Sequence, residues 1–266
     1  IGATGLINVQ DASFIATTLP LNLNASNFLT HQYLFEGEQG LITNEGQILG
    51  HDRALVALVA NAIDNKGTID VPMGRVALAA GDVVTVGISG DGLISIGVDE
   101  ATANELGLNF QIENAGMISS KDGRILLSAK AIDGLFDKAI RIAPGANATS
   151  IIVADNGTIE FVAQGDISSY GALQARNGSI LVSESGDLET MGSLENLTLS
   201  EKAASFRIGG DYLVGESFHD NLDKAITYAS NTNITGTIND AENIIINAGV
   251  TLTLKGNTTF TADSDA

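Results

Sequence analysis

A short pattern that recurs at near-constant intervals is the feature that most limits what this chain can fold into. The pattern Asn-x-Gly-x-Ile begins at Asn44, Asn65 and Asn114, and a shorter form, Asn-Gly-x-Ile, begins at Asn156 and Asn177. The successive spacings are 21, 49, 42 and 21 residues, so most of them are multiples of 21. Self-similarity at such a period is typical of solenoids. The sequence therefore predicts a repeating coil of about 21 residues.

The 49-residue interval keeps the same register on both of its sides. In each of the two coils a Gly-Arg pair follows nine residues after the asparagine, at residues 74–75 and 123–124. The extra residues therefore fit an insertion around residues 88–100. Further along the chain, Gly165 and Gly186 are again 21 residues apart, and an aspartate follows each of them.

Apolar residues alternate within each unit, as in Val76-x-Leu78 and Ile125-x-Leu127. Period-two alternation bounded by Gly, Asn or Asp predicts short strands, and Asn and Gly suit corners with positive φ. We therefore expect an all-β fold, a single-stranded right-handed parallel β-helix whose coils bury a ladder of aliphatic side chains. The corners of the repeat are predicted at Asn44, Gly46, Asn65, Gly67, Gly74, Asn114, Gly116, Gly123, Asn156, Gly157, Asn177 and Gly178.

Two stretches interrupt the repeat. Residues 19–37 are irregular and contain several aromatic residues, and residues 217–230 carry Leu222, Ala225 and Ile226 at helical spacing. We expect both to leave the coil, the second as a short helix. No linker separates two domains, so the prediction is one continuous solenoid of 11 to 13 coils, divided by its motifs into residues 1–100 and 101–266.

Composition excludes several classes of protein. The 266 residues carry a formal net charge of −19, so binding to nucleic acid or to an acidic membrane surface is not expected. No cysteine is present, which excludes disulfides, cysteine-based zinc sites and a thiol nucleophile. The longest apolar stretch, around residues 54–63, is about half of what a transmembrane helix needs, so no membrane insertion is expected.

The order of motifs in residues 1–100 resembles the filamentous-haemagglutinin-type domain of two-partner secretion exoproteins. A GLINV…FIAT coil comes first, and an F…Y-x-F-x-G excursion (Phe28, Tyr33, Phe35, Gly37) follows it. Two Asn-x-Gly-x-Ile coils, GRVALAAGDVVTV (residues 74–86) and GDGLISIGVD (residues 90–99) complete the set. Residues 101–190 look like the coils that follow in such proteins, and later residues only like a generic β-helix.

This resemblance implies a non-catalytic exoprotein that is secreted or displayed on the surface of a Gram-negative bacterium. Such a protein is exported through an outer-membrane β-barrel secretion partner and acts as an adhesin that contacts cells, glycans, proteins or matrix. Family members usually carry an N-terminal cap and Asn-Pro-Asn motifs, and no Asn-Pro pair occurs here. We therefore expect the chain to be an internal piece of a longer exoprotein.

Two other functions stay open at this stage. The first is a self-assembling extracellular filament built by end-to-end stacking of β-helices, since uncapped strand edges template further pairing. The second is a polysaccharide-active enzyme, which would need carboxylates clustered on one strand face. Here the acidic residues are scattered at corners, so no catalytic residues are predicted.

Few residues are candidates for a binding site. The best are Phe28, Tyr33 and Phe35, because aromatic rings stack on sugars and are scarce elsewhere in the chain. The alternative is that these rings pin the excursion against the coil. No metal site or cofactor is predicted, although isolated Ca²⁺ ions at acidic corners would offset part of the negative charge.

Overall fold

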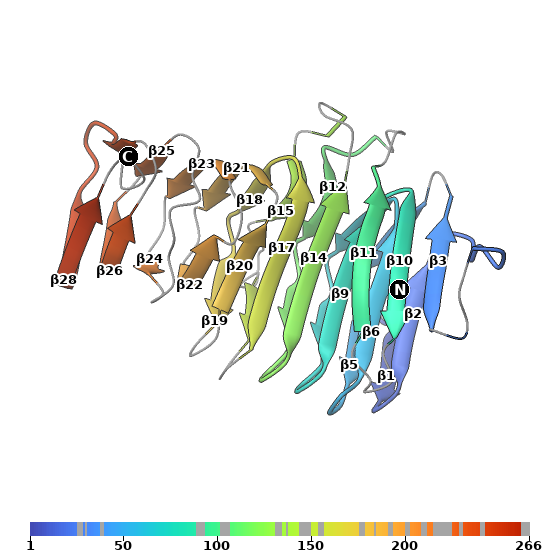
Figure 1. The fold of residues 1–266 in the computed structure, drawn as a ribbon. Coiled ribbons are helices and arrows are strands. Elements are labelled where there is room, and N and C mark those ends of the chain that lie inside the picture. Colours follow the sequence, from blue (N-terminus) through green and yellow to red (C-terminus); the bar gives the residue numbers. More distant parts are fainter. Residues whose placement is uncertain are drawn as a thin grey trace.

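The computed structural model describes most of the chain as stacked β-strands (Figure 1). Most neighbouring strands are parallel, so the predicted all-β parallel β-helix is confirmed. The described residues are all those outside residues 26–28, 30, 38–39, 89–93, 102–106, 131–134, 137, 144–149, 154–156, 176–178, 184, 191–193, 200–202, 209–211, 215–224, 229–230, 240–242 and 262–266.

Up to β21 the strands of the coils form three faces, which we number 1, 2 and 3 in the order in which the coil from β4 to β6 visits them. Face 1 consists of β4 (Leu41–Asn44), β7 (Ala62–Asn65), β12 (Phe110–Asn114), β15 (Lys138–Ile142), β18 (Ile167–Ser169), β21 (Ser185–Thr190), β23 (Ala203–Ile208), β25 (Ala225–Tyr228) and β27 (Asn243–Ile246). Face 2 consists of β1 (Leu6–Gln10), β5 (Gln47–Gly50), β8 (Thr68–Asp70), β13 (Met117–Ser119), β16 (Ser150–Val153), β19 (Ala172–Ala175) and β22 (Leu194–Leu199).

Face 3 consists of β2 (Ser13–Thr17), β6 (Leu55–Ala60), β9 (Arg75–Ala80), β14 (Arg124–Lys130), β17 (Thr158–Gln164) and β20 (Ser179–Ser183). Faces 2 and 3 merge at β22, which pairs with both β19 and β20. From there the merged sheet continues through β24 (Tyr212–Val214), β26 (Thr232–Asn239) and β28 (Leu252–Thr261).

Aliphatic ladders fill the interior of the solenoid. On face 2, Ile48, Ile69, Ile118 and Ile151 occupy successive register positions, and each is fully buried. Similar ladders run along the other faces, because alternate residues of the described coil strands point inward, as Val56 and Leu58 of β6 do. Full burial of one such side chain contributes about 1.5–3 kcal/mol, so stacking each coil on the previous one is favourable.

The 21-residue step is present between β4 and β7 and again between β17 and β20. The 49-residue interval is a single coil plus an insertion, because Thr68 of β8 pairs directly with Met117 of β13. Along the described part of the chain, ten strands succeed one another from β1 to β28. The expected 11 to 13 coils are therefore too many. That number assigned every residue to a coil, whereas the residues of the excursions lie outside the coils.

The shorter Asn-Gly-x-Ile motif belongs to a different corner from the longer one. Ile159, which ends the first short motif, pairs with Ile125 and Ile180 on face 3, whereas Ile48 of the long motif lies on face 2. The short motif therefore corresponds to the Gly-Arg corner between faces 2 and 3. Asn156, Asn177 and Gly178 themselves lie outside the described residues, and Gly157 is buried just before β17.

The helix expected at residues 217–230 is wrong where the structure describes this segment. Residues Ala225–Tyr228 form strand β25, which pairs with β23 on one side and with β27 on the other. A strand in a stack forms backbone hydrogen bonds with the strands on both of its sides. A short helix has no such partners, and the formation of its first turn is unfavourable in free energy. Residues 217–224 and 229–230 lie outside the described residues.

Two excursions meet on the outside of face 3 and form a small antiparallel sheet, which we call the outer sheet. It contains β3 (Gln32–Glu36), β10 (Val83–Ile88) and β11 (Ile94–Glu100), and β10 pairs with the other two strands. The insertion expected around residues 88–100 is thus confirmed and begins at Val83. Figure 1 shows this sheet beside the N-terminal coils.

Candidate ligand-binding groove

A second hydrophobic core fastens the outer sheet to face 3. Phe35, Val84 and Val98 pack against the outward side chains of β6 and β9, among them Val59 and Ala79. All six residues of β6 are buried, because the solenoid interior covers one side of the strand and the outer sheet covers the other. This two-sided burial explains the long apolar run at residues 54–60.

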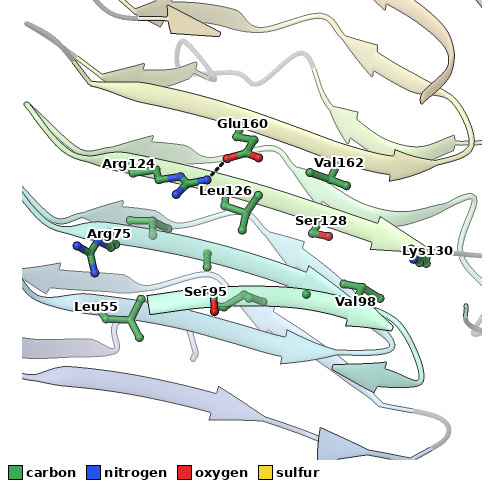
Figure 2. Close-up of a pocket in the computed structure, with 14 residues that line it drawn as sticks. Leu55, Arg75, Ser95, Val98, Arg124, Leu126, Ser128, Lys130, Glu160 and Val162 are labelled. Atoms are coloured by element: carbon green, nitrogen blue, oxygen red, sulfur yellow. Dashed lines mark hydrogen bonds and ion pairs between the residues drawn. The ribbon is translucent and has the colours of Figure 1, made fainter. Parts of the chain in front are cut away.

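A groove lies where the outer sheet ends and face 3 continues uncovered (Figure 2). Strand β11 forms one wall, and the outward side chains of β9, β14 and β17 form the floor and the opposite wall. The volume of the groove is about 260 Å³. Its lining residues are Leu55, Arg75, Val76, Ala77, Ser95, Ile96, Gly97, Val98, Arg124, Leu126, Ser128, Lys130, Glu160 and Val162.

Three cations and one carboxylate lie in this lining. Arg75 and Arg124 occupy directly paired register positions on β9 and β14, at one end of the groove in Figure 2. Glu160 of β17 forms an ion pair with Arg124, and the side chains of the two residues are 19% and 52% exposed. Lys130 lies at the other end of β14, so the arginines and the lysine mark opposite ends of the groove.

The aromatic residues singled out in the sequence contribute to the packing of the outer sheet. Phe35 is buried in the second core, and Tyr33 is half-buried against it. Neither lines the groove. Their placement matches the alternative in which the rings hold the excursion on the coil, and Phe28 lies outside the described residues.

The corner asparagines between faces 1 and 2 form a buried ladder. Asn44 donates from Nδ2 to Oδ1 of Asn65 over 2.8 Å, and Asn65 donates to Oδ1 of Asn114 over 2.6 Å. In the next coil an isoleucine, Ile142, takes the register position of Asn114, so the ladder stops there. These residues satisfy one another's amide groups, which indicates a structural role.

The glycines at the same corner are required by close backbone contact. A Cβ atom on Gly67 would lie 2.0 Å from the carbonyl oxygen of Gly46, and one on Gly116 would lie 1.9 Å from that of Gly67. At the corner between faces 2 and 3, a Cβ atom on Gly123 would lie 2.2 Å from the carbonyl oxygen of Gly74. No larger residue fits these positions unless the coils move apart.

A row of charged side chains runs across three coils of face 1. Glu113 of β12 lies in register between Asp64 of β7 and Arg141 of β15, and Arg141 Nη1 donates to Glu113 Oε1 over 2.8 Å. Lys66 pairs with Asp64. Burial, together with the charge of Asp64, raises the pKa of Glu113, although Arg141 acts in the opposite direction. The hydrogen bond and charge of Asp64 raise the pKa of Lys66.

The described residues contain no group of three or more His, Asp or Glu side chains placed to hold a metal ion. Corner carboxylates instead have protein partners: Asp82 accepts from the Asn61 side chain over 2.7 Å, and Asp166 pairs with Lys138 over 2.9 Å. Nor does this part of the chain contain a helix long and apolar enough to cross a membrane.

Comparison with known proteins gives no family assignment. No protein-family model matches this chain. A search of curated proteins also finds no significant match.

Sequence reasoning did not identify the groove residues. The Gly-Arg pairs at 74–75 and 123–124 define the register between the two coils, and that register places Arg75 beside Arg124. Glu160 and Lys130 lie on the same outward side of their strands, which the period-two alternation also indicates. What the sequence did not indicate is that β11 would lie over these side chains and close one side of a groove.

Proposed function

We propose that this chain belongs to a non-catalytic, secreted or surface-displayed β-helical exoprotein of the two-partner secretion type, which makes adhesive contacts with cells, glycans or matrix. The order of motifs in residues 1–100 supports the family, and the parallel β-helix is the fold expected of it. The observation that carries the contact function is the outer sheet, which the chain builds from two separate excursions.

A solenoid does not need such a sheet in order to fold. Its coils already bury continuous aliphatic ladders, and the outer sheet adds a separate core on the outside of face 3. Because of this sheet, one side of the solenoid has a raised surface and, beside it, a groove lined by cationic residues. A surface of this kind, held on a rigid scaffold, suits recognition of a partner.

Export through an outer-membrane β-barrel partner forms part of the same proposal. The absence of cysteine suits passage of an unfolded chain, because no disulfide can lock it before export. Folding outside the cell would then proceed coil on coil, since each new coil buries its ladder against the previous one.

A site-specific blocking experiment tests the contact function. The cysteine-free chain allows a single cysteine to be introduced and coupled to a bulky polyethylene glycol maleimide. Ser95→Cys places the polymer at the groove wall, and Gln47→Cys places it on face 2, where the native residue is also exposed. Beads coated with each protein are then tested for binding to cells, matrix proteins and a glycan array.

We expect the unmodified chain to bind at least one of these surfaces, the Ser95 conjugate to lose that binding and the Gln47 conjugate to keep it. Equal loss in both conjugates, or no binding by the unmodified chain, would contradict the proposal. Release of reducing ends from a polyuronate panel would identify an enzyme instead.

A further inference from the structure

We infer that the groove binds a small acidic sugar, a uronate-type mono- or disaccharide, whose carboxylate is held by Arg75 and Arg124. This inference rests on the proposed function and deepens it by naming the class of ligand that the contact surface takes. Four observations lead to it: the pairing of the arginines, the sign of the local charge, the composition of the floor and the size of the groove.

The pairing of the arginines comes first. Arg75 and Arg124 are direct register partners on neighbouring parallel strands, on the outward side of face 3. Like charges in this relationship destabilise a sheet. Glu160 offsets part of this repulsion through its ion pair with Arg124, and a bound anion would reduce it further. The planar guanidinium group matches a carboxylate in geometry, since it donates two parallel N–H groups to the two oxygens.

The local charge is opposite in sign to that of the whole chain. The chain has a formal net charge of −19, with only 13 lysines and arginines. Three of those cations, Arg75, Arg124 and Lys130, line this groove together with a single carboxylate, that of Glu160. In an otherwise acidic rod, this groove is therefore a place where a small anion is attracted.

The floor between the charged ends favours a sugar over a simple inorganic anion. Ala77, Leu126 and Val162 present an apolar strip that can contact the C–H face of a pyranose ring. The hydroxyl group of Ser95 and the carboxylate of Glu160 lie at the walls, where sugar hydroxyls need partners. Glu160 would also repel a doubly charged phosphate more strongly than a singly charged carboxylate.

The size of the groove sets the size of the ligand. Its volume of about 260 Å³ lies just below the range typical of sites for drug-sized molecules. This volume suits one or two sugar rings at the end or on a side branch of a glycan.

Titration with free sugars tests the inference. Glucuronic acid and digalacturonic acid are added to the full chain, and binding is followed by calorimetry and by ligand-detected NMR. The methyl ester of glucuronic acid removes the charge and keeps the ring. Arg75→Gln and Arg124→Gln probe the carboxylate contact, and Lys130→Gln is the matched control, because it removes the same charge at the far end of the groove. Thermal unfolding of every variant establishes that the fold is retained.

We expect the uronates to bind and their methyl ester to bind at least about tenfold more weakly. Each arginine variant should lose about tenfold in affinity, whereas Lys130→Gln should lose about twofold or less. Glu160→Gln should bind the acidic sugars a few times more tightly, because it removes the carboxylate that competes for Arg124.

Three results would overturn the inference: no uronate binding, equal binding of acid and ester, or equal losses in the arginine and lysine variants. Its failure can be told apart from failure of the proposed function. If the chain adheres to cells but does not bind uronates, only the proposed class of ligand is wrong. A chain that binds uronates through the arginines but adheres to nothing disproves only the contact function.

Discussion

Asn65 donates a hydrogen bond from its side-chain amide to the side-chain carbonyl of Asn114 over 2.6 Å, although 49 residues separate the two along the chain. Both side chains are fully buried. This contact shows that the interrupted repeat closes again with its corner intact, and that the inserted strands β10 and β11 lie outside the coil. The stability of the corner should therefore depend on this amide ladder.

Replacing Asn65 by Ala should lower the free energy of unfolding by about 1–3 kcal/mol, because it leaves Nδ2 of Asn44 and Oδ1 of Asn114 without the partner that Asn65 supplies. Asn109→Ala, at an exposed position, is the control and should change stability by less than about 0.5 kcal/mol. Urea denaturation measures both variants, and similar losses in the two would mean that the ladder contributes little.

Replacing Met73 by Asn should stabilise the fold. Met73 has a φ of 53°, in the left-handed region that disfavours a methionine, and its side chain is exposed. Asparagine adopts this conformation more readily, so a gain of about 1 kcal/mol is expected in thermal or urea unfolding. Asp122→Asn, at the equivalent position with a φ of 56°, should gain far less, because aspartate already tolerates the conformation. A loss of stability in Met73→Asn would contradict this reasoning.

The pH dependence of stability should contain a contribution from Glu113. Burial raises the pKa of this carboxyl group above its value of 4.5, so the folded chain holds a proton that the unfolded chain has already lost. The free energy of unfolding should therefore fall as pH rises from about 4.5 through the raised pKa of the folded state.

Glu113→Gln, which resembles the protonated form, should flatten this part of the profile and be at least as stable as the wild type at pH 7. Urea denaturation at a series of pH values between about 4 and 8 measures both effects. An unchanged slope in the variant would assign the pH dependence to other groups.

Replacing Phe35 by Ala should loosen the outer sheet while the solenoid stays folded. Phe35 is buried in the second core, and truncation of such a ring costs about 3 kcal/mol or more. Amide hydrogen exchange should accelerate in β10 and β11, whereas protection in β17 should persist. Tyr33→Phe keeps the ring and should change little. If Phe35→Ala abolished ligand binding without faster exchange, the ring would be a ligand contact.

Much of the solenoid could be predicted from the sequence. Alternation in segments such as Ile159-x-Phe161 identifies which side chains point inward, because side-chain direction in a strand depends only on the local backbone. The corner between faces 1 and 2 and the corner between faces 2 and 3 could not be told apart from the sequence. Both need glycine or a residue that tolerates positive φ, so the motif at Asn156 looks like the one at Asn44 although it belongs with the corner at Gly123.

By itself the sequence determined the fold class, the length of the step, the inward side of most strands and the position of the second excursion. Only the tertiary structure decided what covers face 3. Strands β3 and β10 are separated along the chain by the two coils that contain β4 to β9. Their antiparallel pairing forms the second core, and the pairing of β10 with β11 places the groove wall beside Arg75 and Arg124. The period-two pattern indicates which side chains point outward. Non-local packing then decides if an outward side chain contacts solvent or another strand.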